Sequence, residues 1–122
     1  MDGRPESYNE WQGLEPLPIP SIKNESQQGR TYNIEVIHTL AVPVSAEEEM
    51  EVNEDTYQVG THYVFASVKV STKQGTRWFR LPNDLTEWAA FLAVAAKETM
   101  KFPCKIEFGM LRGRNYADFV VP

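Results

Sequence analysis

The sequence predicts a mainly β domain with one helix, placed between the third and fourth of five strands. Three observations lead to this fold class. Apolar and polar residues alternate with a period of two in the stretches 32–44, 62–71, 76–81, 104–110 and 117–121. Between the third and fourth stretches, residues 84–101 change to the spacing of an amphipathic helix. The length of 122 residues suits a single domain with a single core.

The first predicted strand covers residues 32–44. Its even positions, from Tyr32 and Ile34 to Val44, are mostly apolar, and we expect them to face the core. Pro43 marks the end of regular pairing, because proline cannot donate to a strand ladder. Residues 45–60 follow as a long acidic loop, and six carboxylates lie in it: Glu47, Glu48, Glu49, Glu51, Glu54 and Asp55.

The second and third strands are predicted to form a β-hairpin over residues 62–82, with its turn at 72–75. If Ser71 lies opposite Thr76, then Lys69 faces Trp78 and Ser67 faces Arg80. A register shift of two residues changes these partners but keeps every residue on its face. One face is ordinary core and includes Val68, Phe79 and Leu81. The other face combines rings and cations: Tyr63, Phe65, Lys69, Trp78 and Arg80.

The predicted helix begins near Asn83 or Asp84, either of which can cap it, and ends before Pro103. Its apolar stripe consists of Leu85, Trp88, Ala89, Leu92, Ala95, Ala96 and Met100. The two remaining strands are joined by the basic turn 111–115, which contains Arg112 and Arg114.

Residues 1–30 are predicted to be an extended tail, because Pro5, Pro16, Pro18 and Pro20 oppose helix formation. The tail is too apolar for a pure linker, with Tyr8, Trp11, Leu14, Leu17, Ile19 and Ile22 along it. It can pack on its own domain or dock on a partner. The domain proper is expected over residues 31–122.

The net charge of −5 is unevenly distributed. Residues 31–55 carry −7, whereas residues 56–122 carry +4, so the overall acidity does not exclude an anionic ligand for the hairpin. No apolar run is long enough for a membrane span, and the N-terminus lacks the features of a signal peptide, which together favour a cytoplasmic protein. The single cysteine, Cys104, allows no internal disulfide.

The order strand-strand-strand-helix-strand-strand over residues 31–122 resembles the OB-fold, a five-stranded Greek-key barrel. The alternative is an open antiparallel sheet backed by one helix. The resemblance rests on element order and implies a binding surface on the second and third strands and the loops beside them. The residues at those places are Tyr63, Phe65, Lys69, Trp78, Arg80, Arg112, Arg114 and Tyr116.

Rings stack on nucleic-acid bases, and neighbouring cations neutralise phosphates. The sequence therefore predicts a non-catalytic module that binds single-stranded nucleic acid, with DNA favoured over RNA. The alternative function is a structural or adaptor subunit that docks into a larger protein assembly through its N-terminal tail and hairpin face. Unpaired edge strands would also permit a homo-oligomer.

Two further expectations qualify this prediction. The apolar tail can cover the hairpin face and convert it into a second small core. No nucleophile, phosphate-binding or metal-ligand motif is present, so no enzymatic activity, cofactor or metal is expected.

Overall fold

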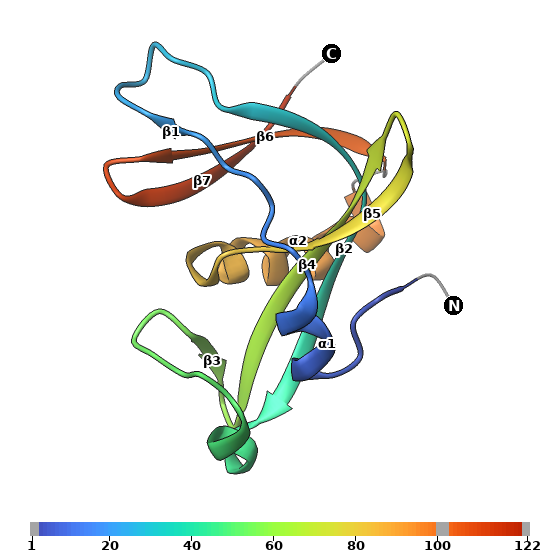
Figure 1. Cartoon of the computed structure of the whole chain (residues 1–122), viewed down its shortest axis with the longest axis vertical. Coiled ribbons are helices and arrows are strands. Elements are labelled where there is room, and N and C mark those ends of the chain that lie inside the picture. Colours follow the sequence, from blue (N-terminus) through green and yellow to red (C-terminus); the bar gives the residue numbers. More distant parts are fainter. Residues whose placement is uncertain (1–2, 100–102, 121–122) are drawn as a thin grey trace.

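The computed structural model describes residues 3–99 and 103–120 and is an open, mixed β-sheet with short helices (Figure 1). The strands in this part of the chain are β1 (Ser21–Ile22), β2 (Arg30–Pro43), β3 (Tyr57–Val59), β4 (His62–Thr72), β5 (Gly75–Arg80), β6 (Cys104–Leu111) and β7 (Arg114–Phe119). The α-helices are α1 (Tyr8–Gly13) and α2 (Thr86–Thr99), and the 3-10 helices are η1 (Val44–Glu49) and η2 (Asn83–Leu85).

The predicted closed barrel is wrong. The sheet has the order β1-β6-β2-β4-β3, with β7 added to β6 and β5 added to β4. In the described part of the chain β5 and β7 do not pair, so the sheet is open, as in the alternative prediction. The β1–β6 ladder is parallel and the other ladders are antiparallel, which makes the sheet mixed rather than purely antiparallel. The expectation of a single helix is also wrong, because α1 is a second one.

A segment from the N-terminal region, residues 15–22, pairs with β5 and with β6. Backbone hydrogen bonds join Arg80 N to Glu15 O and Leu17 N to Arg80 O, each at 3.0 Å. Further along, β1 pairs with the end of β6, and Met110 N donates to Pro20 O at 2.9 Å. Figure 1 shows this segment running from α1 past β5 to β6. Residues predicted as a tail therefore link β5 to β6.

A β-bulge in β2 changes which alternate residues face the main core. Ile34 pairs with Val70 and is fully buried, but the register shifts between Ile34 and Val36. Beyond the shift it is Ile37 that packs against the main core. The even positions 40, 42 and 44 lie on the opposite face. The expectation that all even positions from 32 to 44 share one face is wrong, because a bulge inserts one residue and reverses the alternation.

The hairpin register is confirmed. Ser71 pairs with Thr76, Lys69 with Trp78, and Ser67 with Arg80. Gly75 closes the turn with a φ of +113°, a backbone conformation that glycine adopts without steric cost.

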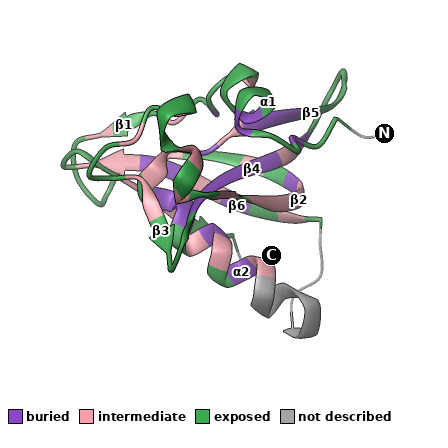
Figure 2. Cartoon of the chain, turned by 90° about the horizontal axis from the view of Figure 1, so that it is seen from below, coloured by how far each residue is buried: buried purple, intermediate pink, exposed green. Residues whose placement is uncertain are grey.

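The main core lies on the face of the sheet that α2 covers. Its fully buried members include Ile34, Val68, Ile106 and Phe108, and Trp88 of α2 packs edge-on against Phe108 with ring centroids 5.9 Å apart. Figure 2 shows α1 and α2 on opposite sides of the sheet. The two predicted caps, Asn83 and Asp84, lie within η2: the Asn83 Oδ1 has no partner in the described structure, and Asp84 accepts hydrogen bonds from Asn115. Met100 of the predicted stripe lies outside the described residues.

The acidic loop 45–60 is more structured than expected. Residues 44–49 form η1, and residues 57–59 form β3, which pairs with the start of β4. The strand has only three residues and stands at the edge of the sheet. Its shortness explains why the sequence pattern did not reveal it.

Candidate functional site

The predicted stacking rings on the hairpin are buried. The exposed fractions of Tyr63, Phe65 and Trp78 are 7%, 1% and 7%. The N-terminal segment, residues 3–14, lies over this face of β4 and β5 (Figure 2).

Aromatic contacts hold the N-terminal segment in place. The Trp11 and Phe65 ring centroids lie 4.7 Å apart, and Tyr8 meets Phe65 edge-on at 5.1 Å. The Trp11 indole Nε1 donates a hydrogen bond to the Ala66 carbonyl at 2.8 Å. Because the indole has both a ring contact and a hydrogen-bond partner, it is packed like a core tryptophan. The partly buried side chains around this cluster are Leu40, Val42, Val44, Met50 and Val52.

Trp78 is covered by the start of the same segment. A Cβ atom on Gly3 would lie only 3.2 Å from Trp78 Cδ1, so the backbone passes directly against the indole. His38 stands edge-on to Trp78 with ring centroids 6.3 Å apart, and its Nε2 lies 3.1 Å from the Pro5 carbonyl. The hairpin face is therefore a second small core, formed with the chain's own N-terminal segment.

The two predicted cations on this face, Lys69 and Arg80, are only half buried. Arg80 Nη1 donates to the carbonyls of Gln12, at 2.6 Å, and Leu14, at 3.0 Å. Its guanidinium also lies 5.9 Å from the centre of the Trp11 ring. Among the described residues an ion pair is recorded for Arg77 but none for Arg80. Arg80 thus keeps an uncompensated positive charge at the edge of the second core.

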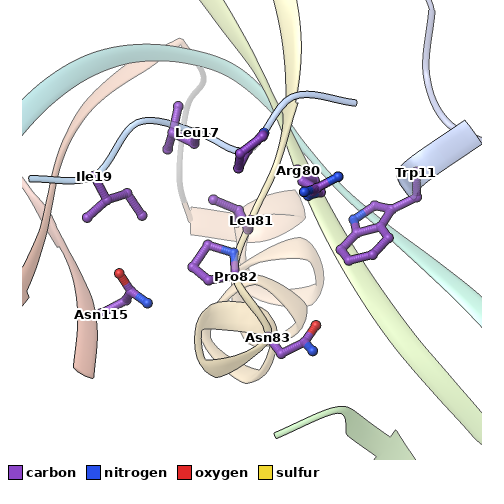
Figure 3. A pocket seen from close by; sticks show the side chains of 9 residues that line it. Trp11, Leu17, Ile19, Arg80, Leu81, Pro82, Asn83 and Asn115 are labelled. Carbon is purple, nitrogen blue, oxygen red and sulfur yellow. The ribbon is translucent and has the colours of Figure 1, made fainter. Parts of the chain in front are cut away.

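A cleft of about 330 Å³ opens beside Arg80 (Figure 3). Four parts of the chain build it: α1, the segment leading to β1, the end of β5 with η2, and the start of β7. Most of its wall is apolar, and the polar side chains are those of Arg80, Asn83 and Asn115. The lining residues are Trp11, Pro16, Leu17, Ile19, Arg80, Leu81, Pro82, Asn83 and Asn115.

The basic turn lies next to this cleft in the chain. Arg112 and Arg114 are exposed, and Arg112 has a φ of +54° at the tip between β6 and β7. Asn115 follows Arg114 directly and lines the cleft. Its backbone N–H donates to Asp84 at 2.9 Å, and its side-chain Nδ2 donates to both oxygens of that carboxylate. These bonds anchor the start of β7 to η2.

Tyr116 belongs to another environment. Successive strand residues point to opposite faces, so Tyr116 and Asn115 diverge. The Tyr116 hydroxyl donates to Glu107 Oε2 at 2.7 Å. That hydrogen bond, with burial and the negative charges of Glu107 and Asp118, raises the pKa of Tyr116 to about 12. The structure therefore brings Arg80 and Asn115 to one cleft, while Arg112 and Arg114 are exposed outside its lining and Tyr116 is directed elsewhere.

Sequence reasoning missed the cleft residues Trp11, Asn83 and Asn115 as site members. Trp11 was visible as an aromatic residue in a supposed tail. Asn115 ended the basic turn that had been noted. Their convergence depends on contacts between residues far apart in the chain, so no local pattern could reveal it.

Two observations concern the remaining reactive side chains. In the described ranges no cluster of three or more His, Cys, Asp or Glu side chains could hold a metal ion. Burial raises the pKa of the Cys104 thiol, which disfavours the nucleophilic thiolate.

Comparison with protein-family models, with curated proteins and with solved structures finds no match to this chain. The longest described helix, α2, has 14 residues, and none in that part of the chain combines the length and hydropathy needed to cross a bilayer.

Proposed function

We propose that the chain is a non-catalytic module that binds single-stranded nucleic acid, with DNA preferred to RNA, at the cleft and the basic turn. The observation that supports this most strongly is the charge of Arg80. It is half buried at a cleft, and in the described structure it has no carboxylate partner. A partly desolvated cation is stabilised by an anion, and guanidinium groups suit phosphate oxygens especially well.

The basic turn extends the same surface. Arg112 and Arg114 are exposed and precede Asn115, which lines the cleft. We propose that a strand bound at Arg80 extends past Asn115 to the exposed cations of the turn. The hairpin rings stay packed in the second core, so we expect affinity to come mainly from phosphate contacts and to fall steeply with salt.

The test is a titration of the full chain against labelled oligo-dT at two salt concentrations, read by fluorescence anisotropy. The double variant Arg112→Gln/Arg114→Gln should weaken binding, and each lost phosphate contact should lower the salt slope by about 0.7. Arg77→Gln is the matched control, because Arg77 is paired with Glu15 at 2.7 Å. No binding of the wild type at low salt, or equal losses in the control, would refute the proposal.

A second candidate function, a structural subunit that assembles with other protein, is favoured by a different surface. Phe91 of α2 is 71% exposed and Val59 of the edge strand β3 is 53% exposed. A cavity of about 580 Å³ lies between these elements and includes Val64, Ala90 and Ala93 in its lining. Exposed apolar surface beside an unpaired strand edge is typical of assembly contacts.

Sedimentation equilibrium tests self-assembly through this surface. If a second copy docks there, the wild type should associate with increasing concentration, and Phe91→Ser/Val59→Ser should remain monomeric. If the wild type remained monomeric at high concentration, self-association through this surface would be refuted.

A further inference from the structure

We infer that the cleft in Figure 3 seats one nucleotide of the bound strand, with its phosphate against Arg80 and its base edge against Asn83 and Asn115. This inference rests on the proposed function and adds to it. The proposed function needs only phosphate contacts with Arg80 and the turn, whereas here the cleft also recognises the base.

The shape and lining of the cleft suit a small, flat ligand. Its volume is about 330 Å³, at the lower end of the range of small-molecule sites. Leu17, Ile19, Leu81 and Pro82 give it apolar walls, and Trp11 lies at the Arg80 end (Figure 3). Mostly apolar walls with a few convergent polar groups are the usual composition of such sites.

Arg80 supplies the anion-binding group. Its recorded hydrogen bonds involve only Nη1, which donates to the Gln12 and Leu14 carbonyls. These bonds fix the guanidinium without neutralising it, since carbonyl oxygens carry no net charge. Nε and Nη2 remain available for a phosphate oxygen. Arg77, three residues earlier on the same strand, is instead neutralised by Glu15.

The two asparagines distinguish a nucleotide from a simple anion. Asn83 Oδ1 is buried and has no hydrogen-bond partner in the described structure, so its amide can turn toward a ligand without losing a bond from that oxygen. Asn115 donates its Nδ2 to Asp84, and its own amide oxygen keeps its acceptor capacity. Either oxygen can accept from a base N–H, such as N3–H of thymine. Inorganic phosphate and sulfate have no base edge to pair with these amides.

Asp84 is the one carboxylate bonded to this group of residues. Both of its oxygens accept hydrogen bonds from Asn115, and one also accepts from the Asn115 backbone N–H. It therefore acts as an anchor that holds Asn115 in position. We expect the phosphate to lie at the opposite, Arg80 end, where the charge is positive.

The experiment is a titration of the full chain with thymidine monophosphate, followed by amide and side-chain NMR shifts. We expect shifts at Arg80, Asn83 and Asn115 and at the Trp11 indole. Arg80→Gln and Asn83→Ala should each weaken binding about tenfold, the order expected when one hydrogen bond to a charged or buried group is lost. The matched controls are Arg77→Gln and Asn9→Ala, the latter on the exposed side of α1.

The outcomes separate this inference from the proposed function. Cleft shifts with thymidine monophosphate that are lost in both cleft variants and kept in both controls support it. Equal affinity for inorganic phosphate would overturn it, because the cleft would then be an anion site only. It would also be overturned if oligo-dT bound through Arg80, Arg112 and Arg114 while thymidine monophosphate left Asn83 and Asn115 unshifted; phosphate contacts alone would then explain binding, and the proposed function would stand. Failure of both ligands would refute both ideas. A dispersed spectrum for each variant confirms that it is folded.

Discussion

The two faces of the β4–β5 hairpin are both buried, but by different means. The face with Val68 and Phe79 belongs to the main core, which long strands and the 14-residue helix α2 enclose. The opposite face, with Phe65 and Trp78, is covered by the N-terminal segment, whose only helix is α1 with six residues. Ser7 caps α1 by accepting from the Glu10 backbone N–H, but an isolated helix of that length is not stable in water, so α1 also depends on its tertiary contacts.

The two faces show that aromatic rings on a strand can be buried in quite different ways, and that their presence alone does not indicate a ligand-binding surface. The main core connects elements that each have a strong pattern of their own. The second core connects a patterned hairpin with a weakly patterned segment 55 residues away, as in the bond from Trp11 to Ala66. We therefore expect the second core to open locally and the main core to open only on global unfolding.

The largest expected effect is in the main core. Phe108→Ala should lower the free energy of unfolding by about 3–5 kcal/mol, because it removes a fully buried ring and leaves a cavity. Urea denaturation measures this loss. Phe91→Ala is the control, since Phe91 is mostly exposed and its removal should change stability by less than about 0.5 kcal/mol. Equal losses in both variants would contradict the placement of the core.

Truncation in the second core tests the comparison directly. Trp11→Ala removes the ring contact with Phe65 and the hydrogen bond to Ala66, and should destabilise the N-terminal segment by about 3 kcal/mol. Hydrogen exchange should speed up for residues 8–14, while the amides of Ile106 and Phe108 remain protected. Uniform acceleration throughout the chain would show that the two cores form one cooperative unit.

A smaller effect is expected where β6 meets β7. A Cβ atom on Gly109 would lie 2.5 Å from the Tyr116 ring, so Gly109→Ala must displace that ring, at a cost of about 1–3 kcal/mol. Gly13→Ala at the end of α1 is the matched control, because no atom lies within 4 Å of its Cβ position. Thermal unfolding should show a lower melting temperature for Gly109→Ala than for Gly13→Ala. Equal melting temperatures would contradict the close packing at Gly109.

The smallest effect concerns pH. The hydrogen bond to Glu107 raises the pKa of Tyr116 to about 12, above its ordinary value of 10. A raised pKa means that the folded state holds this proton more tightly than the unfolded state does. The stabilisation is therefore complete below pH 10 and is lost as the pH rises to about 12.

Tyr116→Phe tests this dependence. The variant should lose about 1 kcal/mol at neutral pH, the usual value of one hydrogen bond. Its free energy of unfolding should also fall less steeply with rising pH in the alkaline range, because phenylalanine has no proton to lose. Denaturation midpoints across the alkaline range measure both effects, and parallel pH curves for the two proteins would argue against the bond.

Much of the secondary structure could be predicted from the sequence. The pairing of Ser71 with Thr76 was confirmed, together with the other pairs of that register. The strands are joined by a two-residue turn, Lys73 and Gln74, and a turn of that length fixes the register. The bulge after Ile34 was not predictable, since a bulge depends on the partner strand and leaves the apolar pattern unchanged. Of the residues expected to form the site, Arg80 lines a cleft, whereas Tyr63, Phe65 and Trp78 are buried in a core.

The local elements follow from the amino-acid sequence alone: the mainly β character, the hairpin and its two faces, the long helix, and the basic turn. These depend on residues close together in the chain, whose alternation and turn chemistry act locally. What covers each face, whether the sheet closes, and which polar side chains meet at one cleft became known from the folded structure. Those outcomes depend on residues 3–22 packing against strands far along the chain, and apolar burial is non-directional, so a sequence pattern shows that a face will be covered without showing by what.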